Sequence, residues 1–82
     1  MTKRRLTLLF REYCSLCHAM LAALNAHPGR ASFEIDIVDI DADPVLESRY
    51  NDRVPVLLAG DDEICHYHLD ATALDAYLAS IG

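Results

Sequence analysis

The chain has 82 residues, 52% of them hydrophobic, and a formal net charge of −6. This length allows one small domain with a modest core, expected to span residues 1–82, and no apolar stretch approaches the length that spans a membrane. With 13 acidic against 7 basic residues there is no basic stripe for a phosphate backbone, so neither nucleic acid nor a membrane is expected as a partner.

The spacing of the apolar residues predicts a β-α-β-α-β-β-α order of elements. These are a strand at 6–10, a helix at 15–26, a strand at 33–40, a helix at 44–50, strands at 54–58 and 63–67, and a final helix capped by Asp70. The final helix is expected to turn one apolar face to the core, made of Leu74, Tyr77, Leu78 and Ile81.

This order determines the expected fold class. The first three elements form a βαβ unit, whose two strands lie parallel. The last two strands are joined by a short turn at 60–62 and form an antiparallel hairpin. We therefore expect an α/β domain with a four-stranded mixed sheet flanked by helices.

The pair Cys14-x-x-Cys17 follows the first predicted strand and opens the first predicted helix. A pair of thiols at this spacing is a redox signature, and a helix start stabilises negative charge on the first thiol. The apolar run after the basic residues 3–5 is too short for the core of a signal peptide. We therefore expect a cytoplasmic protein, in which structural disulfides are disfavoured and paired cysteines indicate redox or metal chemistry.

The strand, Cys14-x-x-Cys17, the helix and a later Val54-Pro55 before an apolar strand together resemble the thioredoxin fold. The short chain is most similar to glutaredoxins, and among them to the small bacterial glutaredoxin-like proteins. The resemblance covers about residues 6–81. It implies a thiol–disulfide oxidoreductase acting in electron transport and cell redox homeostasis, with Cys14 as the exposed nucleophile and Cys17 as the resolving thiol.

The same resemblance implies a set of substrate-binding residues around the dithiol. Arg11 would help to hold the thiolate and glutathione, and Tyr13 matches an aromatic residue that often precedes the first cysteine. A cis peptide bond before Pro55 would leave the backbone of Val54 free to pair with a substrate strand. Asp70 would meet an amine group of the substrate.

The expected partners follow from this chemistry. They are a disulfide-containing protein or small-molecule substrate and a thiol reductant, which is either glutathione or an enzyme of the thioredoxin-reductase type. No bound cofactor is expected, and the chain is expected to be a monomer. Ser15-Leu16 stands where typical glutaredoxins have Pro-Tyr, and the glycine pair that grips glutathione is missing, so the electron donor stays open.

The same cysteines leave an alternative, a metal-binding or iron–sulfur module without redox turnover. Zinc favours Cys and His ligands, and Cys65, His66 and His68 supply such groups, but their spacing matches no common zinc finger. Cys65 is interpreted as a small buried apolar residue. Cys14-x-x-Cys17-His18 also matches the attachment pattern of c-type haem. The mixed-sheet pattern of the rest of the chain argues against a haem protein.

Overall fold

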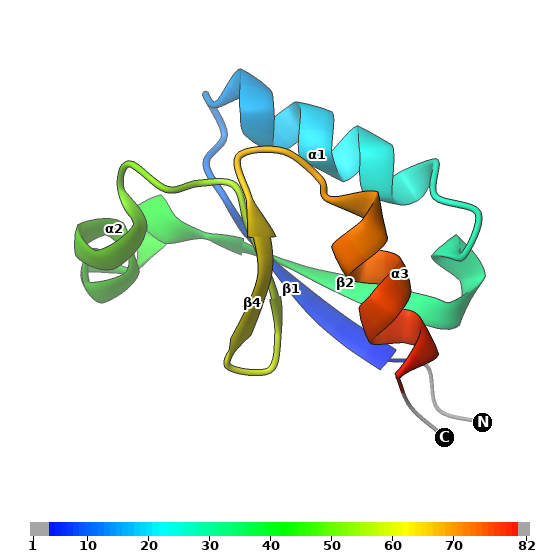
Figure 1. The fold of residues 1–82 in the computed structure, drawn as a ribbon. Coiled ribbons are helices and arrows are strands. Elements are labelled where there is room, and N and C mark those ends of the chain that lie inside the picture. The colour runs from blue at the N-terminus through cyan, green and yellow to red at the C-terminus, as the bar shows by residue number, and fades with distance from the viewer. Residues whose placement is uncertain (1–3, 81–82) are drawn as a thin grey trace.

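The computed structural model describes residues 4–80 and confirms the predicted order of elements (Figure 1). The main elements are β1 (Arg4–Phe10), α1 (Ser15–Asn25), β2 (Phe33–Asp39), α2 (Pro44–Tyr50), β3 (Val56–Ala59), β4 (Asp62–His66) and α3 (Ala71–Ala79). Two short 3-10 turns that the sequence did not predict, η1 (Arg30–Ser32) and η2 (Ile40–Ala42), precede and follow β2. Among the described residues, no helix is long and apolar enough to cross a membrane.

The four strands form one mixed sheet in the order β2-β1-β3-β4. β1 and β2 are parallel, as the predicted βαβ unit requires, and pair from Arg4 opposite Phe33 to Phe10 opposite Asp39. β3 is antiparallel both to β1 and to β4, which confirms the predicted hairpin. The expected α/β fold class, a four-stranded mixed sheet flanked by helices, is therefore correct.

Helices α1 and α3 pack side by side, whereas α2 stands apart from them near the end of β2 (Figure 1). His27, just after α1, forms a hydrogen bond of 2.8 Å with Asp75 of α3 and so joins the end of α1 to α3. Arg4 at the start of β1 donates to the carbonyl of Tyr77 in α3 over 2.9 Å. These two contacts lie at the end of the domain where α1 ends and β1 begins. The Cys14 turn lies at the opposite end, where α1 begins.

The core lies between α1, α3 and the central strands. Helix α1 contributes a stripe of Cys17, Met20 and Leu24, whose spacing puts them on one helix face. Leu6 and Leu8 of β1 are fully buried against this layer. Removing the side chain of such a leucine lowers the free energy of unfolding by about 2–5 kcal/mol. The packing of β1 against α1 therefore contributes strongly to the stability of the domain.

The predicted start of the third strand differs from the structure. Strand β3 begins at Val56 and not at 54, because Pro55 has no N–H to donate to the sheet ladder. Ile37 of β2, an edge strand of the sheet, is 52% exposed. Leu74 is buried in the apolar face of α3 as predicted, and Ile81 lies outside the described residues.

Candidate functional site

Cys14 is the N-cap residue of α1, in extended backbone conformation. Its own N–H donates to the carbonyl of Arg11 over 3.0 Å, which turns the chain between β1 and the helix. Its Sγ accepts the backbone N–H of Cys17 over 3.3 Å. The sulfur therefore occupies the place that serine or aspartate oxygen takes in most caps. Negative charge on that sulfur is favoured by the positive end of the helix dipole.

Cys17 lies one turn further along α1 and differs sharply from Cys14 in accessibility. Cys14 is partly exposed, whereas Cys17 is 0% exposed, and both are free thiols. Burial, and next the hydrogen bond with Cys14, raises the pKa of Cys17 from 9.0 to about 12. The site thus combines one reachable sulfur with a buried neighbour that holds its proton at neutral pH.

Arg11 lies beside this turn but has a partner of its own. Its guanidinium donates to both carboxylate oxygens of Asp41, with a shortest distance of 2.8 Å, and to the carbonyl of Asn51 over 3.2 Å. The hydrogen bond with Asp41 raises the pKa of Arg11. Arg11 still acts on the dithiol, because a hydrogen bond from its backbone and, to a smaller extent, its charge lower the pKa of Cys17 and so oppose the effect of burial in part.

Tyr13 and Leu16 form an apolar rim on either side of Cys14 in the chain. Tyr13 is 77% exposed, and the guanidinium of Arg11 lies 5.2 Å from the centre of its ring. Leu16 is 37% exposed and is not part of the buried stripe of α1, which begins at Cys17. These two side chains give the reachable sulfur an apolar surrounding.

The Val54–Pro55 segment lies next to the same turn. The β1–β3 pairing ends with Leu9 opposite Val56, so Val54 precedes β3 at the same end of the strand pair where Arg11 follows β1. The predicted cis peptide bond is present between Val54 and Pro55. Within residues 4–80 no hydrogen bond engages the backbone N–H or carbonyl of Val54. The fold therefore places Arg11, Cys14 and Val54 at the same end of the β1–β3 strand pair.

Asp70 lies at the start of α3, where its carboxylate has a structural partner. Its carboxylate caps α3 by accepting the N–H of Ala73 over 3.0 Å. Its backbone N–H faces the thiol of Cys65 and not the dithiol, and the described chain shows no hydrogen bond from Asp70 to Cys14 or Cys17. Cys65 is 8% exposed and burial raises its pKa, in agreement with its interpretation as a core residue.

Three residues near the site were not identified from the sequence. Asp41 and Asn51 hold Arg11, and Tyr67 holds the segment before β3 through its N–H, which donates to the carbonyl of Pro55 over 2.8 Å. Asp41 directly follows the second predicted strand, which was a usable signal. Nothing in the linear pattern indicated the roles of Asn51 or Tyr67, because each contributes through the backbone or through a contact between distant segments.

The histidines do not gather into a metal site. His18 donates from Nε2 to the carbonyl of Glu12 over 2.7 Å, and its ring packs edge-on against Phe10. His66 forms a surface pair with Glu63 over 2.8 Å. Across residues 4–80 no group of three His, Cys, Asp or Glu side chains is arranged to hold a metal ion.

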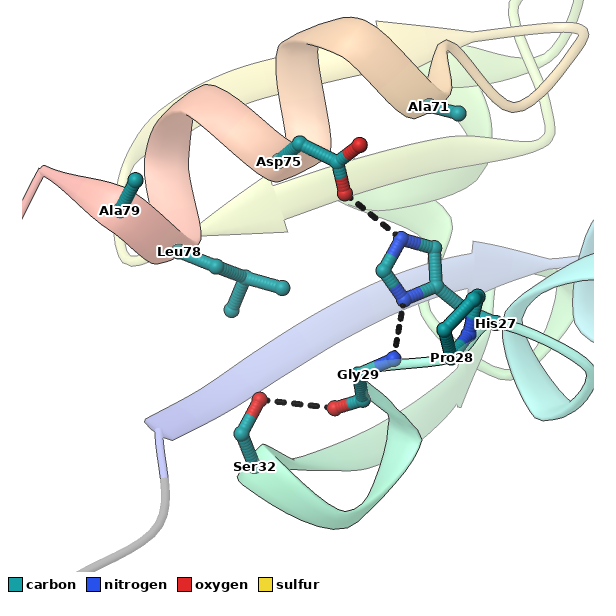
Figure 2. A pocket seen from close by; sticks show the side chains of 8 residues that line it. All are labelled: His27, Pro28, Gly29, Ser32, Ala71, Asp75, Leu78 and Ala79. Carbon is teal, nitrogen blue, oxygen red and sulfur yellow. Dashed lines mark hydrogen bonds and ion pairs between the residues drawn. The ribbon is translucent and has the colours of Figure 1, made fainter.

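An open pocket of about 750 Å³ lies at the other end of α1, between η1 and α3 (Figure 2). His27 projects into it, with Nε2 paired to Asp75 over 2.8 Å and Nδ1 accepting the N–H of Gly29 over 2.8 Å. Ser32 donates its hydroxyl to the carbonyl of Gly29 and not to His27. Both ring nitrogens are therefore occupied by structural partners.

Comparison with known proteins identifies relatives of this chain. The Glutaredoxin-like domain (DUF836) matches residues 5–79, and a comparison with curated proteins finds no match. The solution NMR structure of protein Ne2328 from Nitrosomonas europaea is similar over 96% of this chain and 95% of its own, with 42% identity and a TM-score of 0.82.

Two further solved structures extend the comparison. The X-ray structure of protein XcR50 from X. campestris shares 37% identity over 94% of this chain and 99% of its own, with a TM-score of 0.69. A malarial protein with 17% identity and a TM-score of 0.53, over 96% of this chain and 97% of its own, shares the fold alone. The sheet order and three helices are those of a thioredoxin-like fold. The chain belongs to the Glutaredoxin-like domain family.

Proposed function

We propose that this domain is a thiol–disulfide oxidoreductase that reduces substrate disulfides through Cys14 and Cys17. Membership of the Glutaredoxin-like domain family suggests a function of the thiol redox type. The observation that supports the specific proposal is the asymmetry of the pair. Cys14 is reachable and caps α1, whereas Cys17 is fully buried one helical turn away. A working dithiol needs one accessible nucleophile and a second thiol close behind it.

The proposed reaction has two thiol–disulfide exchanges. The Cys14 thiolate attacks one sulfur of the substrate disulfide, forms a mixed disulfide and releases the first substrate thiolate, which takes up a proton. The Cys17 thiol then loses its proton and attacks Cys14 Sγ, which forms the Cys14–Cys17 disulfide and releases the second substrate thiol. The substrate gains two electrons and two protons, and the dithiol loses them. Because burial raises the pKa of Cys17 to about 12, its deprotonation is expected to limit the second exchange.

The surroundings of Cys14 support the binding roles proposed for the neighbouring residues. Tyr13 offers an exposed ring to the substrate, and the unpaired backbone of Val54 beside Pro55 offers an edge for a substrate strand. Arg11 supplies positive charge near the dithiol. Asp70 would take part only through a substrate long enough to reach the start of α3, where its carboxylate serves as the helix cap.

The oxidised pair must be reduced for turnover. Glutathione or an enzyme of the thioredoxin-reductase type would supply the two electrons, with no bound cofactor in the domain itself. A disulfide-containing protein or small molecule is the proposed substrate, and the domain would act as a monomer. The reducing cytoplasm is the proposed compartment, because cysteines there stay reduced unless they take part in redox chemistry.

The decisive test compares Cys14→Ser with Cys17→Ser and the unchanged protein in a disulfide reductase assay. Cys14→Ser should abolish activity, because serine is not a nucleophile for disulfides at neutral pH. Cys17→Ser should accumulate a mixed disulfide that mass spectrometry detects. Activity that survives Cys14→Ser would refute the proposal.

A second measurement separates this proposal from a metal or iron–sulfur module that uses the same cysteines. The absorbance spectrum and metal content of the purified protein are expected to show neither a cluster nor stoichiometric zinc. The dithiol is expected to show a reversible two-electron transition across glutathione redox buffers. Counting the free thiols at each buffer composition measures this transition. Iron colour that disappears with Cys14→Ser would favour the binding module instead.

A further inference from the structure

Tyr67, directly after β4, is the residue that holds the segment between α2 and β3 in place. Its backbone N–H donates to the carbonyl of Pro55 over 2.8 Å. Its hydroxyl reaches back to the carbonyl of Asp52 over 2.7 Å. One residue therefore holds this segment from two sides, once through its main chain and once through the end of its side chain.

The two contacts of Tyr67 lie on either side of Val54 in the chain. They engage the carbonyls of Asp52 and Pro55, and within the described residues they leave the N–H and the carbonyl of Val54 unpaired. The β1–β3 pairing ends with Leu9 opposite Val56, so Val54 and the Cys14 turn lie just beyond the same end of this strand pair. Val54 is 7% exposed, and the held segment thus presents a fixed, unpaired backbone edge of narrow access at the end of the sheet where the reachable thiol lies.

The backbone of Tyr67 indicates that this arrangement is specifically maintained. Tyr67 has φ of 64°, and in residues 4–80 it is the only non-glycine residue with positive φ. Glycine adopts such a conformation readily, whereas a tyrosine there pays a conformational penalty. The ring packs edge-on against His66 at 4.7 Å and stays 40% exposed, so burial of the ring alone does not explain its presence. The hydroxyl contact to Asp52 gives the tyrosine a role that glycine could not fill.

We propose that Tyr67 is a positioning residue that keeps the Val54 backbone ready to pair with disulfides carried on a peptide chain. This inference rests on the proposed oxidoreductase function and narrows its substrate class. A peptide or protein disulfide has amide groups on both sides of its cysteines and gains two backbone hydrogen bonds from an ordered Val54. A small disulfide without amide groups gains nothing from that order and depends on Cys14 alone.

The test uses Tyr67→Phe, which keeps the ring and its packing on His66 and removes only the hydroxyl bond to Asp52. The kcat and KM of the full chain are measured with a cystine-containing peptide and with bis(2-hydroxyethyl) disulfide, which has no amide group. KM for the peptide should rise about fivefold, the change expected for one weakened hydrogen bond, while kcat stays unchanged. Both constants for bis(2-hydroxyethyl) disulfide should stay at the values of the unchanged protein.

Two further variants sharpen the comparison. Tyr77→Phe removes a hydroxyl from α3, away from the Cys14 turn, and should change neither substrate's constants. Tyr67→Gly accepts the backbone conformation but removes the ring, and should raise KM for the peptide at least as much as Tyr67→Phe. Circular dichroism and the urea midpoint of each variant establish that the fold is retained.

The outcomes separate this inference from the function on which it rests. Failure of the unchanged protein to reduce either disulfide would overturn the proposed function and this inference together. Reduction of both disulfides with the same constants in Tyr67→Phe and the unchanged protein would overturn the role of Tyr67 alone. An equal loss with both disulfides would also overturn it, because a general loss of structure does not discriminate between substrates.

Discussion

The backbone N–H of Cys17 donates a hydrogen bond to the Sγ of Cys14 over 3.3 Å, so the nucleophile of the proposed reaction is also the cap of its helix. This double role makes Cys14→Ser a clean substitution. Serine is a preferred N-cap residue, and its hydroxyl can take the same N–H. Loss of activity in that variant would report the missing sulfur and not a disordered helix.

The three cysteines are expected to react with an alkylating agent in a fixed order. At neutral pH Cys14 should be modified first, because Cys17 is 0% exposed with a pKa of about 12 and burial raises the pKa of Cys65. A time course followed by peptide mass spectrometry measures the order. Cys14→Ser should lose the fast phase, and rapid modification of Cys17 in the folded protein would contradict the prediction.

The stability of the domain is expected to fall at alkaline pH. Cys17 has its pKa raised from 9.0 to about 12 in the folded state, so the native protein holds a proton that the unfolded chain releases. This contribution is complete below pH 9.0 and is lost progressively as pH rises toward about 12. Urea unfolding at several pH values measures the slope.

Cys17→Ala provides the comparison for the alkaline slope. It lowers stability at neutral pH by leaving a small cavity, but its stability should fall less steeply with alkaline pH than that of the unchanged protein. Cys14→Ser should keep the steeper slope, since Cys17 is still present. Equal slopes in Cys17→Ala and the unchanged protein would show that the buried thiol does not hold its proton.

Two histidines that each hydrogen-bond to a carboxylate should differ in their importance for stability. His27 and His66 each pair with a carboxylate at 2.8 Å, but their side chains are 9% and 39% exposed, respectively. His27→Ala removes a contact between the end of α1 and α3 and leaves the Gly29 N–H without its acceptor, which should cost about 1–3 kcal/mol. His66→Ala should cost less than about 1 kcal/mol. The urea-derived free energies of unfolding test this ranking, and equal losses would contradict it.

Asp70 is expected to stabilise α3 whether or not it also binds substrate. Asp70→Ala removes the cap contact to Ala73 and should cost about 1 kcal/mol, whereas Asp70→Ser should retain most of it. Thermal or urea unfolding measures both. With glutathione as reductant, a binding role for the carboxylate would raise the glutathione KM in both variants, including the one that keeps the cap. An unchanged KM for glutathione in Asp70→Ser would show that Asp70 serves only as the cap of α3.

The sequence was sufficient for the order of elements and for the placement of Cys14 at a helix start, because both depend on local periodicity and on capping. The resemblance also predicted the cis bond before Pro55, but the spacing of the apolar residues placed the start of β3 two residues too early. The engagement of Arg11 by Asp41 and the contacts of Tyr67 could not be derived in the same way. They depend on the distance between segments that meet only when the sheet is assembled, and no pattern along the chain encodes that distance.

The bond between Arg11 and Asp41 also has a consequence for how the family can change over time. The carboxylate compensates a guanidinium that is only 11% exposed, and the two positions lie 30 residues apart. Loss of Arg11 alone would leave the carboxylate of Asp41 without its counter-charge, and loss of Asp41 alone would leave a poorly solvated cation without its own. Descendants that replace one of the two residues should therefore replace the other, and the pair should be inherited as a unit.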